Sequence, residues 1–152
     1  MLQITKVFII LLSGLSIINF QPIKFINRTS ASTLLTVKAT GFRNNKGKAG
    51  FALYNSQKSY DKDEPFKEQS ATIDNNSSTV TFQNISPGTY VAAVFHDENN
   101  NGKLDENMLG IPTEGIGLSN NPKISITDIP TFDKTKFSLT KDKLVIELNL
   151  QY

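Results

Sequence analysis

Apolar and polar residues alternate along most of the chain beyond residue 32, with the two-residue period of half-buried β-strands. Leu35, Val37 and Ala39, for example, are separated by a threonine and a lysine. Short segments of this kind, bounded by turn residues, occur at 35–39, 49–53, 71–73, 80–82, 89–95, 137–139 and 144–150. The polar segment 55–69 predicts a loop with one helical turn. The pattern predicts an all-β fold: an antiparallel β-sandwich of about seven strands, of immunoglobulin or transthyretin type.

Segment 89–95 differs from the other predicted strands because it is apolar on both faces. This composition is typical of a central strand that is covered on both sides. Aromatic residues recur at strand period in this segment and in two others, and we expect them in the core: Phe51, Tyr54, Phe82, Tyr90 and Phe95.

The first residues do not follow the strand pattern. Lys6 precedes an apolar run at 7–18, which is typical of a secretory signal and is shorter than the roughly 20 residues of a membrane span. We therefore expect residues 1–31 to be a signal peptide or N-terminal leader, and residues 32–152 to form the β-sandwich domain. The protein would be secreted, periplasmic or attached to the cell envelope, with membrane contact only through an uncleaved leader.

Composition and charge narrow the possible functions. The chain has no cysteine, so the core or a metal ion has to stabilise the fold without disulfides. The formal charge of +2 includes Lys6, Lys24 and Arg28 of the leader, and without them thirteen bases face fourteen acids, a charge of −1. A domain of this charge gives no reason to expect nucleic-acid binding.

An acidic loop directly follows the predicted central strand. Asp97, Asn99, Asn101 and Asp105 occupy positions 1, 3, 5 and 9 of a calcium loop of the EF-hand kind, with Gly102 at position 6 and the Lys103 carbonyl at position 7. Alternate residues of such a loop point inward, and a hard cation takes six to eight oxygen ligands. The sequence therefore predicts a Ca²⁺ site here.

The match to the calcium loop has a gap at position 12, where Met108 replaces the bidentate acid. Glu106, Glu114 or a water molecule could complete the coordination. The missing acid and the two asparagines favour a weak site, on the order of 10⁻⁴–10⁻³ M. A turn held by its own hydrogen bonds is the alternative, since Asn, Asp and Gly are common turn formers. Segment 97–114 carries five acids against one base, a crowding that favours a bound cation.

The only histidine, His96, is expected to be structural and to orient Asp97 or Glu114 by hydrogen bonding. With one histidine and no cysteine, zinc is improbable. The glycine-rich segment 110–120 does not follow the dinucleotide fingerprint and predicts a fixed loop that passes close to other backbone. A ligand groove is the alternative for that segment.

Three strings of the sequence resemble a widespread family of exported bacterial proteins known only as a domain of unknown function: Pro87–Tyr90 (PGTY), His96–Asp105 (HDENNNGKLD) and Gly110–Ser119 (GIPTEGIGLS). The resemblance covers about 35–152 and implies an exported β-sandwich without a known activity. The acidic loop also resembles the calcium loops in the B-type repeats of staphylococcal surface adhesins, which usually have an acid where this chain has Met108.

Three functional hypotheses follow. The first is a non-enzymatic, monomeric, calcium-stabilised module with a protein or polysaccharide partner in the cell envelope. The second is a hydrolase acting on carbohydrate or peptide through Glu114 and His96, or through Glu114 and Asp97 as a carboxylate pair. The third is a carbohydrate- or peptide-binding module without a metal, which would need exposed aromatic residues such as Tyr54 and Tyr60.

Overall fold

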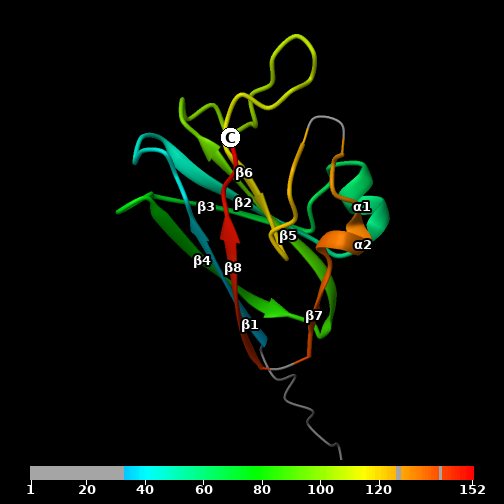
Figure 1. Cartoon of the computed structure of the whole chain (residues 1–152). Helices are drawn as coiled ribbons and strands as arrows, with labels where there is room; N and C mark the ends of the chain where they lie inside the picture. Colours follow the sequence, from blue (N-terminus) through cyan, green and yellow to red (C-terminus); the bar gives the residue numbers. More distant parts are fainter. Residues whose placement is uncertain (1–32, 126–127, 141) are drawn as a thin grey trace, which may run out of the picture.

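A computed structural model describes residues 33–125, 128–140 and 142–152, and the predicted leader at 1–31 lies outside these ranges. The described residues form eight strands and two short helices (Figure 1). The strands are β1 (Thr33–Thr40), β2 (Lys48–Tyr54), β3 (Lys67–Ala71), β4 (Ser77–Ile85), β5 (Gly88–Asp97), β6 (Ile116–Leu118), β7 (Phe137–Leu139) and β8 (Lys143–Asn149). The helices are α1 (Gln57–Asp61) and α2 (Phe132–Thr135). Neither helix has the length and apolar character needed to cross a membrane.

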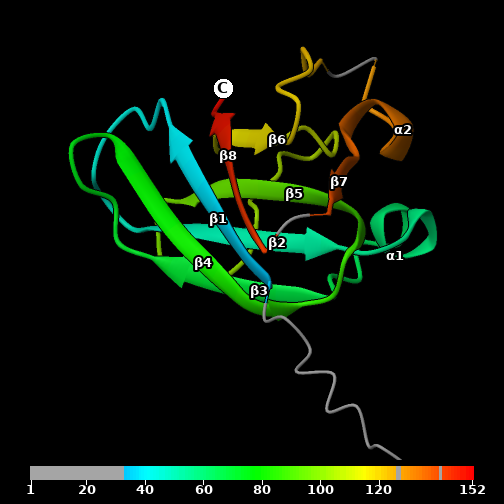
Figure 2. The same ribbon diagram turned by 90° about the horizontal axis from the view of Figure 1, so that it is seen from below.

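The strands form two sheets, which confirms the predicted all-β sandwich. One sheet has the order β4-β1-β8, and the other has the order β3-β2-β5-β6, with β7 paired to the beginning of β5. All pairings are antiparallel except that of β1 with β8, which places the first and last strands side by side in parallel. Figure 2 shows the first sheet lying obliquely across the second.

The core lies between the two sheets. Its side chains come from both layers, and those that are at most 2% exposed include Leu35, Val37, Phe51, Leu53, Phe82, Ile85, Val94, Leu139 and Leu148. Burial of a side chain of this size contributes about 1.5–3 kcal/mol, so the alternation read from the sequence accounts for the pairing of the layers. The core is large enough to hold a fold that has no disulfide.

Strand β5 is central, as predicted, because both of its faces are covered. Tyr90, Ala92 and Val94 enter the main core, and Val91 on the opposite face packs in a second cluster with Tyr54 and Phe132. The expectation that all five aromatic residues lie in the core is wrong for Phe95. This side chain is only partly buried on the outer face of the sheet, where its ring covers Gly50.

Main-chain bonds close one corner of the sandwich, where the end of the chain meets β6. Gln151 and Ile116 exchange two hydrogen bonds of 2.8 and 2.9 Å, and the Leu150 N–H donates to the Thr40 carbonyl at 2.9 Å. These bonds bring the C-terminus to the end of the sandwich where β5 finishes (Figure 1). The last residue is thereby placed next to the acidic loop.

Other details differ from the sequence prediction. The strand expected at 71–73 lies earlier in the chain, as β3, and ends at Ala71. The helical turn expected within 55–69 is α1, whose N-terminus is capped by the Ser56 side chain accepting from the Ser59 N–H at 3.2 Å. Strand β6 and helix α2 are additional elements. The prediction that the glycine-rich segment passes close to other backbone is confirmed at Gly117, since a Cβ there would lie 3.1 Å from the Asn149 carbonyl oxygen.

Candidate functional site

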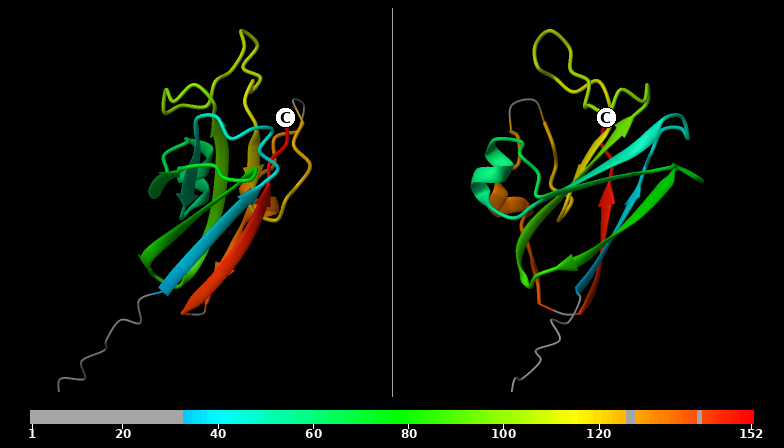
Figure 3. Two further views of the ribbon diagram at one scale, coloured as in Figure 1. Left: turned by 90° about the vertical axis from the view of Figure 1, so that its left-hand side faces the viewer. Right: turned by 180° about the vertical axis from the view of Figure 1, so that it is seen from behind.

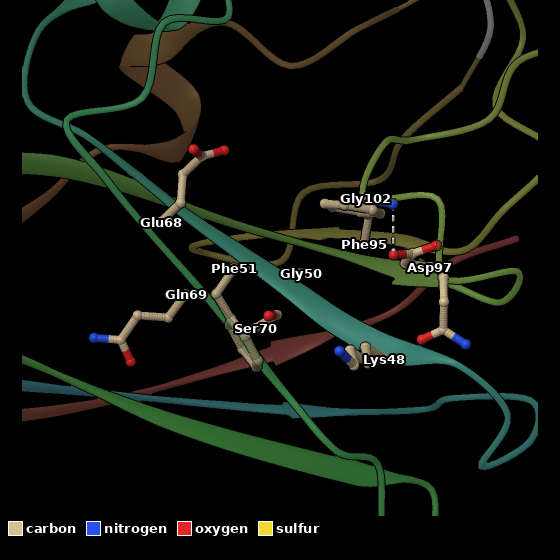
Figure 4. A pocket seen from close by; sticks show the side chains of 10 residues that line it. Lys48, Gly50, Phe51, Glu68, Gln69, Ser70, Phe95, Asp97 and Gly102 are labelled. Carbon is tan, nitrogen blue, oxygen red and sulfur yellow. Dashed lines mark hydrogen bonds between the residues drawn. The ribbon is translucent and has the colours of Figure 1, made fainter.

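The acidic loop begins where β5 ends and projects beyond both sheets (Figure 3). Asp97 is 5% exposed, and its carboxylate organises the first turn of the loop. One oxygen accepts from the Asn101 N–H at 3.0 Å and the other from the Gly102 N–H at 2.9 Å (Figure 4). The turn needs left-handed backbone at Asn100 (φ 60°) and Gly102 (φ 77°), which asparagine and glycine adopt more readily than other residues.

The other predicted ligand residues converge on the same turn. Asn99 Oδ1 accepts from the Asn101 N–H at 2.9 Å, and Asn101 Oδ1 accepts from the Lys103 N–H at 2.8 Å. The side-chain amides of both asparagines donate to the two oxygens of Asp105, at 2.6 and 2.7 Å. The side chains of Asn99 and Asn101 are therefore joined through Asp105, and Asp97 is linked to them through the Asn101 N–H. We call these four residues the Asp/Asn ring (Asp97, Asn99, Asn101 and Asp105).

Glu114 is buried beside the Asp/Asn ring, at 6% exposure. Its Oε1 accepts from the Glu98 N–H at 2.8 Å, and its Oε2 accepts from the Asp105 N–H at 3.1 Å. One carboxylate thus holds both ends of the loop. An ion could reach Glu114 only through lone pairs that these bonds leave free, so its clearest role is to brace the loop.

His96 is fully buried, and both ring nitrogens have partners. Its Nε2 lies 2.9 Å from the Lys46 carbonyl oxygen and must donate to it, and its Nδ1 lies 2.8 Å from the Tyr152 hydroxyl. The structural role expected for His96 is confirmed, but its expected partners are wrong because it bonds neither Asp97 nor Glu114. A histidine in this position has no free nitrogen to act as the base of a hydrolase.

Tyr152 and Gly47 hold the base of the loop, and sequence reasoning missed both. The Tyr152 hydroxyl also accepts from the Arg43 N–H at 3.0 Å, and its ring lies over Gly115, where a Cβ would come within 2.4 Å of it. A Cβ on Gly47 would lie 1.9 Å from the Asp97 carbonyl oxygen. These contacts depend on residues distant in sequence, and only the glycines gave any signal.

An ion pair between Arg43 and Glu98 completes the base of the loop, with 2.5 Å between the guanidinium and the carboxylate. Burial acts to raise the pKa of Glu98, but hydrogen bonds from Arg43 and Asn44, together with the charge of Arg43, outweigh it and lower that pKa below its ordinary value. The Arg43 guanidinium also stacks 4.8 Å from the centre of the Tyr152 ring. Tyr152 is thus held by the hydrogen bonds of its hydroxyl to His96 and Arg43 and by the Arg43 guanidinium over its ring.

Within the described ranges, no three His, Cys, Asp or Glu side chains are close enough together to hold a metal ion. The Asp/Asn ring contributes two carboxylates and two amides, and Lys103 contributes a carbonyl. A cation here would therefore depend on neutral oxygens for more than half of its protein ligands, which suits a hard ion such as Ca²⁺ better than zinc.

The fold and the loop place the protein in the class of small β-sandwich modules with an Asp- and Asn-rich loop at one end. The chain belongs to the family described as uncharacterized protein conserved in bacteria (DUF2141), which matches residues 37–147. This confirms the expected bacterial family of unknown function and adds no activity, ligand or partner. No curated protein and no solved structure matches the chain.

Proposed function

We propose that the protein is an exported, non-enzymatic β-sandwich module whose loop at 97–105 binds Ca²⁺. Asp97, Asn99, Asn101, Asp105 and the Lys103 carbonyl would hold the ion. The module would act as a monomer in the cell envelope or outside the cell, where its partner would be a protein or a polysaccharide. Occupancy of the loop would stabilise the folded state by mass action.

The observation that carries this proposal is the convergence of four oxygen-bearing side chains in the Asp/Asn ring. Their hydrogen bonds, between 2.6 and 3.0 Å, keep the side chains close together without a cation. The same bonds would also satisfy a metal-free turn. The charge of the loop favours the cation, because segment 97–114 has five acids and one base, and among the described residues only Glu98 of these acids forms an ion pair. Like charges held together are unfavourable without a counterion.

The hydrogen bonds also indicate how binding would proceed. The amides of Asn99 and Asn101 now direct their N–H groups at Asp105, whereas a cation needs oxygen from all three side chains. Rotation of these amides would be the local rearrangement that accompanies binding. This cost, together with the full exposure of Met108 at the place of the missing acid, supports a weak affinity on the order of 10⁻⁴–10⁻³ M.

Thermal unfolding in calcium and in chelator tests the proposal. With a dissociation constant of about 1 mM, roughly 10 mM calcium should add about 1.4 kcal/mol, which corresponds to about 5–6 °C for a domain of roughly 120 residues. Asp105→Asn is the sharpest variant, because within the described ranges the Asp105 side chain hydrogen-bonds only the two asparagine amides. It should abolish the calcium-dependent gain.

The matched control is Asp133→Asn, which removes one carboxylate from an exposed ion pair with Lys136 elsewhere. It should keep the full gain. Equal melting temperatures of the unaltered protein in calcium and in chelator would contradict the proposal, as would an undiminished gain in Asp105→Asn.

A further inference from the structure

The outer face of the sheet β3-β2-β5-β6 is hollowed between helix α1 and the acidic loop. Two adjoining hollows of about 790 and 350 Å³ share Glu68, Phe95 and Gly102. The floor is low because Ala52 and Ala93 face each other on β2 and β5. The volume of each hollow lies within the roughly 300–1,000 Å³ of typical ligand sites, and the volume of the two together is slightly above that range. We call the combined hollow the outer trough.

Aromatic side chains bound the alanine floor at both ends. The Phe95 ring lies over Gly50 at one end, and Tyr54 and Tyr60 meet edge to face at the other, with ring centres 5.4 Å apart. The Tyr60 hydroxyl donates to the Pro130 carbonyl at 2.8 Å. The rings are therefore held in place before any ligand arrives.

The larger hollow is acidic. Asp61, Asp63, Glu68 and Glu106 line it, and Lys103 is its one basic residue. Among the described residues, none of these four carboxylates forms a salt bridge, and only Asp63 is tied down, by the Tyr54 hydroxyl. Burial, followed by that hydrogen bond, raises the pKa of Tyr54, so the phenol stays a neutral donor. Four carboxylate charges without an ion-pair partner among the described residues therefore line the hollow beside an apolar floor, and three of them also lack a hydrogen bond from Tyr54.

From this geometry we propose that the outer trough binds an extended peptide segment carrying lysine or arginine side chains. Such side chains combine an apolar stem with a cationic head, which matches an alanine and aromatic floor beneath a carboxylate rim. The smaller hollow, shown in Figure 4, is lined by Lys48 and Ser70, which offer donors and an acceptor for a peptide main chain. A free polyamine has no acceptor for Lys48, so a peptide fits better.

The floor and the aromatic wall of the outer trough do not depend on a cation in the acidic loop. Its floor belongs to the sheet, and its aromatic wall belongs to α1 and the end of β2. Of the acidic loop, Gly102, Lys103, Leu104 and Glu106 line the larger hollow, and Asp97, Asn100 and Gly102 line the smaller one. Peptide binding should therefore be measurable both in calcium and in chelator, which separates this proposal from the one above.

Fluorescence anisotropy with the full chain tests the proposal, using a labelled peptide of alternating lysine and alanine at low salt. The peptide should bind, and its counterpart with glutamate in place of lysine should not. Glu68→Gln combined with Glu106→Gln should weaken binding about fivefold, because two exposed ion pairs are lost. Lys103→Gln should strengthen it about twofold by removing the one base of the larger hollow.

Two further variants separate a specific site from general attraction to an acidic surface. Asp74→Asn combined with Glu147→Gln changes the net charge equally, away from the outer trough, and should leave binding unchanged. Ala93→Leu should abolish binding by filling the floor, while circular dichroism checks that it folds. Equal weakening by both charge-changing pairs would overturn the proposal. Undiminished binding in Ala93→Leu, or displacement of the peptide by equimolar spermidine, would also overturn it.

Discussion

Glu114→Gln preserves the size of a buried side chain while changing one of its two acceptors into a donor. The glutamine oxygen can still accept from one of the N–H groups of Glu98 and Asp105. Its amide group then faces the other N–H, so that two donors oppose each other in a place that is 6% exposed. One end of the acidic loop loses its anchor.

The size of the effect follows from these two bonds. A hydrogen bond to a charged group contributes about 1.5–3 kcal/mol, and a buried donor without a partner adds a desolvation cost of similar size. Because the main chain can relax, we expect a net loss of about 2–3 kcal/mol. For roughly 120 residues this lowers the melting temperature by about 8–12 °C.

Urea unfolding and amide hydrogen exchange measure this loss globally and locally. Exchange should accelerate most at the amides of Glu98 and Asp105, since Glu114 binds both. Glu106→Gln is the control, because it removes a carboxylate from the same loop at an exposed position. A melting temperature for Glu114→Gln within about 2 °C of this control would refute the bracing role.

Two more predictions concern the base of the loop. Gly47→Ala should lower the free energy of unfolding by about 3 kcal/mol or more, because φ is +70° and the new Cβ would clash with the carbonyl at the end of β5. Gly102→Ala should lower it by only about 1–2 kcal/mol, because φ is +77° but no atom lies within 4 Å of the new Cβ. Equal urea midpoints for the two variants would contradict this. The lowered pKa of Glu98 contributes stability that is present above its ordinary value of 4.5 and is lost as the pH falls through the folded-state pKa. Arg43→Met should flatten this acid-induced decline in urea midpoint, and an unchanged pH profile would show that the ion pair is not its cause.

The alternation of residues was sufficient to predict the layered fold, because strand period depends only on local sequence. Leu35, Val37 and Phe82 lie in the core for this reason. Strand β6 could not be found in the same way, since its three residues pair with β5 on one side and contact the end of the chain on the other. Phe95 was misplaced because strand period gives the face of a strand but not what covers that face.

In the candidate site, too, the sequence predicted what depends on local spacing and missed what depends on distant residues. The side chains of the Asp/Asn ring follow one another within nine positions, so spacing alone could group them. The partners of His96 are Lys46 and Tyr152, which are 50 and 56 positions away, and no spacing rule reaches so far. The outer trough also escaped the sequence, because it depends on the pairing of Ala52 with Ala93 across two strands.

The parallel pairing of β1 with β8 has a consequence for how the protein is made. Their side chains come from opposite ends of the domain, as with Lys38 and Glu147, which are 109 positions apart. In a nascent chain, β1 is synthesised early, but its second neighbour in the sheet is present only after β8 has been synthesised. The sheet β4-β1-β8 cannot be completed before β8 has been synthesised, and its long-range contacts are typical of domains that fold in milliseconds to seconds. Until then one edge of β1 has no strand to pair with.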